Sequence, residues 1–287
     1  MKAGLFALAA LLTLCQPVRA DDPPLRSWTF DDDVVSIEKI AGGDGLGQDL
    51  LTIRRSGILI HAEIAPHIDF ITSDQGAADT PKLVPITSAA ARDLVIETFS
   101  GGAHCCFSIE VATLGDPFHI SEPLDVRDAG AATFALPGNS LLGLRSADEA
   151  YAYRWTSFAA SPAPELLLRY DTGKGFSLAA DLMKKPPPSA EKLQQMMAAM
   201  RADAGWKDSA GSPPTAYLQA VLDLIYSGNL KTAQRYAAKA WPETVTGRQD
   251  FIDDLNQCAL PSSPWWTSVA ALNGIKPYDP AKDCKSD

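Results

Sequence analysis

The chain has 287 residues, with 35 acidic against 25 basic side chains and a formal net charge of −10. An acidic chain repels phosphate groups, and no Lys/Arg cluster here is longer than a pair, so we expect no nucleic-acid partner and no anionic membrane partner. The length is sufficient for one large hydrophobic core or two modest ones.

The first twenty residues have the pattern of a secretory signal peptide. Lys2 precedes an apolar run over residues 5–14, and Ala20 is the small residue that ends the segment. We expect cleavage after Ala20 and a periplasmic mature protein. Cys15 leaves lipoprotein processing as an alternative, but Leu14 precedes it where that cleavage usually requires Gly, Ala or Ser.

Removal of the signal peptide makes the chain more acidic. It takes Lys2 and Arg19 from the 25 basic residues and leaves 23, against 35 acidic ones, a formal net charge of −12. No later stretch approaches the roughly twenty uninterrupted apolar residues of a membrane-spanning helix. We therefore expect an exported protein without a transmembrane segment.

Residues 21–183 form a predicted β domain. Short apolar or alternating runs are separated there by Gly, Pro and Asp, which is typical of an all-β region. The expected strands cover residues 34–40, 50–53, 58–64, 68–72, 94–99, 107–114, 132–136, 141–144, 150–155 and 166–170.

The central feature of this domain is a predicted β-hairpin over residues 93–114. Strand-forming residues run up to Phe99, and a period-two alternation begins at Phe107. Gly101 and Gly102 lie between them and can adopt the positive φ that a tight bend requires. The hairpin loop also carries His104, Cys105 and Cys106, three residues able to bind metal or to act as nucleophile and base.

Three strand segments are similar to one another: DLLTIRRSG from Asp49, DLVIETFSGG from Asp93 and SLLGLRSAD from Ser140, spaced by 44 and 47 residues. Repeats at that period indicate propeller-type blades. These segments resemble FG-GAP/VCBS β-propeller repeats, whose blades carry an acidic calcium loop before a strand. Only fragments of that loop match, so the resemblance implies no calcium site here.

The resemblance does not decide whether the sheets close into a propeller. Three copies do not close a propeller of four or more blades. The alternatives are a diverged fourth blade, a curled open antiparallel sheet, or a β-sandwich. The string SGGAHCC at residues 100–106 also resembles uncharacterised exported bacterial proteins, a family that implies no activity.

A linker and a helical domain follow the β domain. Three successive prolines in residues 184–189 interrupt any strand or helix, and Ser189 begins a helical pattern. In the helical domain, residues 190–287, we expect helices at 190–205, 216–226, 230–241 and 248–258, with Thr215 as a cap. The pair at 216–241 resembles one tetratricopeptide-type hairpin, which implies packing and no peptide binding. The predicted fold class is therefore α+β with segregated parts, a propeller-like or curled β domain before an α-helical domain.

The mature chain has four cysteines, which allow three fully paired connectivities. We expect disulfides Cys258–Cys284 and Cys105–Cys106, because the prolines and tryptophans of the tail suggest that it folds back on the helix ending at Cys258. Two bridges from the hairpin to the tail are the alternative. In an exported protein a disulfide is favoured over a metal site or a catalytic cysteine, although His104, Cys105 and Cys106 stay candidates for a metal.

The sequence contains no GxSxG, HExxH, GxxxxGK[ST] or CxxC motif. This absence favours a non-catalytic binding or interaction module of the cell envelope, a monomer without a cofactor, whose partner is an envelope protein or a small ligand. The question of enzymatic activity stays open. The alternative function is a redox or metal-binding protein, or an enzyme, centred on His104, Cys105 and Cys106.

Overall fold

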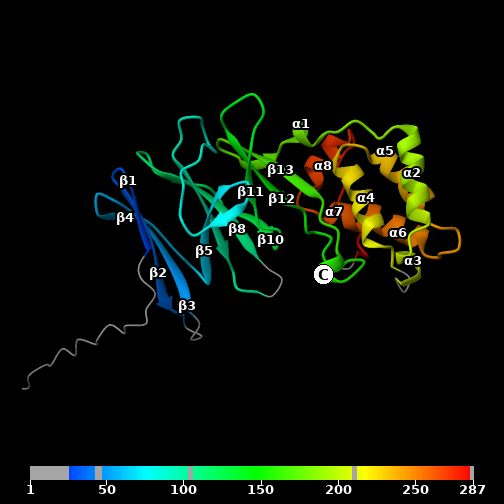
Figure 1. Ribbon diagram of the computed structural model, residues 1–287, viewed down its shortest axis with the longest axis horizontal. Coiled ribbons are helices and arrows are strands. Elements are labelled where there is room, and N and C mark those ends of the chain that lie inside the picture. The colour runs from blue at the N-terminus through cyan, green and yellow to red at the C-terminus, as the bar shows by residue number, and fades with distance from the viewer. Residues whose placement is uncertain (1–25, 43–46, 103–105, 209–211, 285–287) are drawn as a thin grey trace, which may run out of the picture.

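The computed structural model describes residues 26–42, 47–102, 106–208 and 212–284. It is a mixed α+β structure, with strands in the first part of the chain and helices in the second. Figure 1 shows three sheets and the helices arranged in a row. No helix within the described residues has the length and apolar character needed to span a bilayer.

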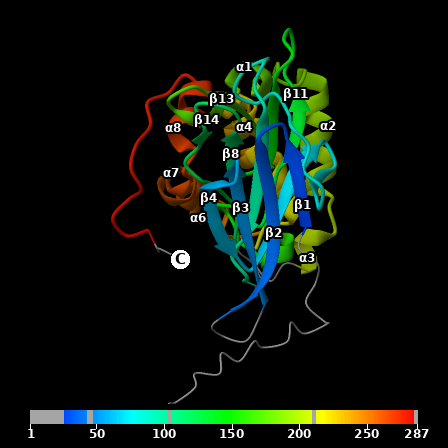
Figure 2. The ribbon, with the colours of Figure 1, turned by 90° about the vertical axis from the view of Figure 1, so that its left-hand side faces the viewer.

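The first sheet, sheet A, is an antiparallel meander at one end of this row. Alternate residues of its two central strands are buried, among them Val35, Ile37, Leu51 and Ile53, because one sheet face packs against the next sheet. The opposite face is uncovered in the described structure and is turned to the viewer in Figure 2. The four strands follow the chain order β1 (Arg26–Phe30), β2 (Asp33–Ala41), β3 (Gly47–Arg55) and β4 (Ile58–Ala65).

The second sheet, sheet B, lies between the other two and is buried on both faces. Leu94 and Ile96 of its central strand pack against sheet A, whereas Val95 belongs to the cluster shared with the third sheet and the helices. Its order is β10-β8-β7-β5-β6, with β9 paired to β8. The strands are β5 (His67–Ser73), β6 (Gly76–Ala78), β7 (Asp93–Phe99), β8 (Phe107–Thr113), β9 (His119–Ile120) and β10 (Leu124–Arg127).

The third sheet, sheet C, is again an antiparallel meander, in the order β11-β12-β13-β14. Gly143 allows close packing here, because a Cβ atom at this position would lie 2.4 Å from the Leu168 carbonyl oxygen and 2.6 Å from the Phe134 ring. The strands are β11 (Ala132–Ala135), β12 (Leu142–Ala147), β13 (Glu165–Asp171) and β14 (Gly175–Leu178).

One expected strand, residues 150–155, is wrong. This segment lies in the β12–β13 connection, which leaves sheet C and packs on the helices. Its alternating aromatic residues resemble a strand pattern, but Tyr151 is buried against Tyr226 of a helix, and their hydroxyls lie 2.8 Å apart. All other expected strands overlap strands of the structure.

The helices begin where the last strand ends. A helix begins after Ser189, as predicted, and Ser189 caps it, since its Oγ accepts the Lys192 N–H at 3.1 Å. Thr215 is not a cap; it is the first helical residue, and its hydroxyl donates to the Ala160 carbonyl at 2.8 Å. The elements are the 3₁₀ turn η1 (Phe158–Ala160), α1 (Ala180–Met183), α2 (Ala190–Arg201), α3 (Gly205–Asp208), α4 (Thr215–Tyr226), α5 (Leu230–Ala240), α6 (Arg248–Asp254), the π turn η2 (Leu255–Ala259), α7 (Leu260–Ser262) and α8 (Trp266–Leu272).

Residues 184–189 contain neither helix nor strand, and they contact the helices. The Lys185 N–H donates to the Ser227 carbonyl at 3.1 Å, and Asn229 Nδ2 donates to the Lys185 carbonyl at 3.0 Å. A continuous hydrophobic cluster also extends from sheets B and C into the helices. The two parts of the chain therefore share buried contacts, and the domain limits stay a prediction.

Candidate functional site

The predicted hairpin is confirmed: β7 and β8 pair from Asp93 opposite Thr113 to Phe99 opposite Phe107. At its turn, the Ser100 N–H donates to the Cys106 carbonyl at 3.0 Å, and Gly101 has φ +87°. Any side chain at position 101 would crowd Pro66, whose Cγ lies 3.1 Å from the position of a Cβ. The turn therefore packs against the β4–β5 connection.

The cysteine predictions are answered in part. Cys258 and Cys284 form the expected disulfide, with a Cα–Cα distance of 5.4 Å, which excludes two bridges between hairpin and tail. His104 and Cys105 lie outside the described residues, so their predicted roles are untested. Cys106 is disulfide-bonded. Across the described residues, no group of three or more His, Cys, Asp or Glu side chains is placed to hold a metal ion.

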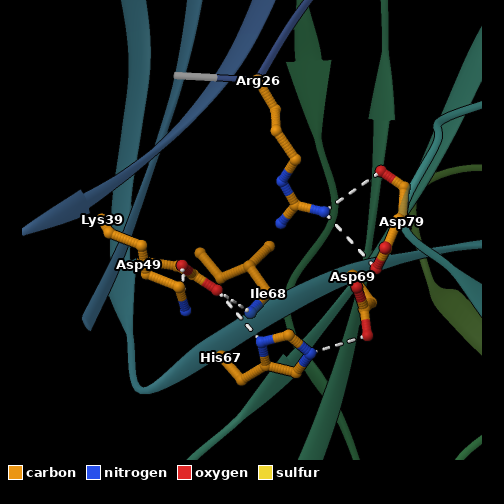
Figure 3. Close-up of polar contacts among 7 residues, drawn as sticks. All are labelled: Arg26, Lys39, Asp49, His67, Ile68, Asp69 and Asp79. Atoms are coloured by element: carbon orange, nitrogen blue, oxygen red, sulfur yellow. Dashed lines mark hydrogen bonds and ion pairs between the residues drawn. The ribbon is translucent and has the colours of Figure 1, made fainter. Parts of the chain in front are cut away.

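Next to this turn, a histidine lies between two carboxylates (Figure 3). His67 Nδ1 is 3.1 Å from Asp49 Oδ2, and His67 Nε2 is 2.8 Å from Asp69 Oδ2. Asp49 is fully buried; it also accepts the Ile68 N–H at 2.9 Å and lies 2.6 Å from Lys39 Nζ. Because both ring nitrogens of His67 are occupied, the ring has no nitrogen left for a substrate or a metal. This network joins sheet A to sheet B.

The same contacts determine the ionisation of Asp49. Burial alone would raise the pKa of its carboxyl group, but the hydrogen bonds from Lys39 and from the Ile68 N–H outweigh burial, and the pKa lies below its usual value. The carboxylate therefore stays charged at neutral pH and serves as a fixed acceptor.

Asp93 has a similar role one repeat later. It is fully buried and accepts the backbone N–H groups of Ile86 at 2.8 Å and Thr87 at 2.6 Å. The Thr113 hydroxyl donates to it at 2.6 Å. The repeated Asp-Leu pair at residues 49 and 93 therefore marks internal acceptors for neighbouring backbone. The aligned sequence segments were the signal for these two residues, but a buried acceptor cannot be recognised without the contacts.

A second polar cluster lies between β4 and β8. Glu63 and Glu110 share a hydrogen bond, and His61 Nε2 lies 3.9 Å from Glu63 Oε2. His61 Nε2 and Glu63 Oε2 are both buried, and neither atom has a hydrogen-bond partner in the described structure. Burial first, then the charge of Glu63, raises the pKa of Glu110 to about 7. One carboxyl of this pair is therefore protonated in mildly acidic solution.

This pair predicts a pH-dependent stability. A raised pKa means that the folded protein holds the proton more tightly than the unfolded chain does. The stability that protonated Glu110 contributes is therefore complete below the ordinary pKa of 4.5 and is lost as the pH rises through about 7. The free energy of unfolding of Glu110→Gln should equal that of the wild type at pH 4 and should be higher by about 1–2 kcal/mol at pH 8. Urea unfolding at both pH values measures this difference. Glu38→Gln, on the exposed face of sheet A, is the control, and a Glu110→Gln gain that is the same at both pH values would contradict the shared proton.

The strand that carries Glu63 also has an exposed apolar edge. Five large hydrophobic side chains are exposed in the described structure, and three of them belong to β4: Ile58 at 69%, Leu59 at 47% and Ile64 at 56%. β4 is an edge strand, paired with β3 alone among the described strands. Figure 2 shows it at one side of sheet A, with β1 at the other.

Comparison with protein families, with curated proteins and with solved structures finds no match to this chain.

Proposed function

We propose that the protein is an exported binding module of the cell envelope, and that it takes up an extended segment of a partner protein along the free edge of β4. The observation that carries the proposal is the concentration of exposed Ile58, Leu59 and Ile64 on one edge strand. An edge strand offers unpaired N–H and C=O groups, which bind another strand by main-chain hydrogen bonds.

The composition of β4 supports this use. Its sequence, ILIHAEIA, contains none of the Lys, Arg or Pro residues that usually protect an edge from pairing. Its one acidic residue, Glu63, turns toward β8 and is not on the open face. An added strand would thus meet mainly apolar side chains.

The geometry of sheet A specifies the partner segment. The side chains of a strand added beside β4 point alternately to the two faces of sheet A. One is the open face, where Ile64 and Leu50 lie opposite each other, and the other is the face that carries Glu63. The partner segment should therefore have apolar residues at alternate positions and no acidic residues between them.

The alternative is a redox or metal-binding protein centred on His104, Cys105 and Cys106. Cys106 is disulfide-bonded in the structure, and no other contact among the described residues favours this alternative over the binding module. Thiol titration of the native protein with metal analysis tests it, since free thiols with stoichiometric metal would support that alternative.

We also propose that the three sheets are related as propeller-type blades. Each sheet is antiparallel and is built from consecutive strands, and the three similar sequence segments fall on the inner strands β3, β7 and β12. These features support an origin by repetition of a blade-like unit.

Site-specific photocross-linking in the producing cells tests the partner site. With benzoylphenylalanine at position 58 or 64, both positions should join to one segment of one envelope protein, and mass spectrometry should show that the segment is apolar at alternate positions. Leu59→Lys in the same chain should reduce this cross-linking at least tenfold, because it places a charge on the apolar edge.

The control position is Thr29, which is exposed on β1 at the opposite edge of sheet A. Equal cross-linking from position 29, adducts between two copies of this chain, or no adduct from 58 and 64 would each contradict the proposed partner site.

A further inference from the structure

A cavity of about 560 Å³ lies where the β12–β13 connection meets the C-terminal helices. Its size is that of an ordinary small-molecule site. The residues that line it come from distant parts of the chain: Arg154, Trp155, Ser212, Pro213, Trp241, Gly247, Asp250, Phe251, Asp254, Cys258, Asp283 and Cys284.

Aromatic rings form one part of the cavity wall. Trp155 and Phe251 have ring centroids 5.3 Å apart, and Trp241 lies 5.8 Å from Phe251. Trp155 also stacks on Tyr151, with an interplanar angle of 9°. Phe251 and Trp241 are buried behind Trp155, which is partly exposed. Aromatic faces attract cations through their negative π-electron density.

The positively charged residue of the cavity lining, Arg154, is already neutralised by an ion pair. Arg154 donates two hydrogen bonds to Asp254, at 2.9 Å from Nε and 2.6 Å from Nη2, and the Trp155 indole N–H donates to the same carboxylate at 2.8 Å. This bidentate pair holds Trp155 in place and leaves Arg154 without free charge for an anionic ligand.

Two carboxylates of the lining are not compensated in this way. Asp250 on α6 and Asp283 in the C-terminal segment are exposed, and neither forms an ion pair within the part of the chain that the structure describes. The disulfide between Cys258 and Cys284 attaches the segment carrying Asp283 to the wall, aided by the Ala281 N–H, which donates to the Gln257 carbonyl at 3.0 Å.

We propose that this cavity binds an organic cation, an ammonium or guanidinium group on an apolar stem. The aromatic wall accepts the stem and the charge, and Asp250 and Asp283 supply the negative charge that an anionic or neutral ligand would not use. The net negative charge of the chain also favours the approach of a cation over that of an anion. The site is independent of the β4 edge.

A cation of this kind has two sources: a free small-molecule ammonium compound or the Lys or Arg side chain of another protein. Calorimetric titration with choline, a quaternary ammonium ion, and with a peptide carrying one central lysine separates them. Tighter binding of choline indicates a free ammonium compound, tighter binding of the peptide indicates a protein side chain, and either result supports the proposed chemistry.

The decisive comparison uses a neutral molecule of the same shape. 3,3-Dimethylbutan-1-ol has the shape of choline without its charge, so it should bind at least about tenfold more weakly, a difference of about 1.4 kcal/mol. Equal binding of choline and this alcohol, or no binding of choline and the lysine peptide, would overturn the proposal.

Two sets of variants test whether choline binds in this cavity. Asp250→Asn combined with Asp283→Asn should weaken choline binding at least tenfold, and because both side chains are exposed, circular dichroism should show an unchanged fold. The matched control is Asp253→Asn, since Asp253 lies on the same helix, binds Gln249 and does not line the cavity. If the double variant binds choline as tightly as the control does, the cation site is not here.

Discussion

Replacing Tyr151 with alanine should reduce the free energy of unfolding by about 4 kcal/mol, whereas Tyr151→Phe should cost about 1 kcal/mol. The side chain is fully buried between the β12–β13 connection and the helices. Its ring stacks on Trp155 and meets Tyr226 edge-on, with centroids 5.9 and 6.3 Å away. Alanine removes all of these contacts and leaves a cavity, while phenylalanine loses only the hydroxyl contact at 2.8 Å.

Urea unfolding followed by circular dichroism measures both variants. Tyr153→Ala is the matched control, because Tyr153 lies on the same connection and is 55% exposed; it should cost at most about 1 kcal/mol. A cost for Tyr151→Ala as small as that of the control would mean that the connection does not hold the sheets and helices together.

The same tyrosine predicts an alkaline limit to stability. Burial first, then the charge of Asp148, raises the pKa of Tyr151 well above the ordinary value of 10.0. The folded protein therefore holds this proton more tightly than the unfolded chain, so the stability it contributes is complete below pH 10 and decreases above it. Absorbance of the Tyr151 phenolate should appear only as the protein unfolds.

Cys284→Ser should destabilise the protein by about 3 kcal/mol, because the Cys258–Cys284 bond closes a loop with a sequence separation of 26 residues. The loss should be confined to the C-terminal segment and α6–η2, and the β-sheets should keep their structure. Choline binding should also weaken, since Asp283 is no longer attached to the cavity wall.

A double-mutant cycle makes this prediction sharp. Cys258→Ser, Cys284→Ser and the combined variant should have the same stability, because either substitution alone removes the whole bond. Amide hydrogen exchange locates the loss along the chain. Additive costs, or faster exchange in β7 and β8, would show that the bond acts differently from a local loop closure.

Local patterns in the sequence determined much of the secondary structure. The β7–β8 hairpin follows from period-two alternation around Gly101, and the start of α2 follows from the Ser189 cap, because both depend on residues close together in the chain. The Cys258–Cys284 disulfide was also predictable, since the prolines and tryptophans between them indicate a tail that folds back.

Tertiary contacts decided the rest, because burial and sheet position depend on residues far apart in sequence. Residues 150–155 have the alternation of a strand, yet Tyr151 finds its partner Tyr226 on a helix 75 residues later. Asp49 is an internal acceptor only because the backbone of Ile68 lies next to it, and β4 is an open edge only because no further described strand pairs beside it. The cation cavity joins Trp155, α6 and the C-terminal segment, and no local pattern contains that combination.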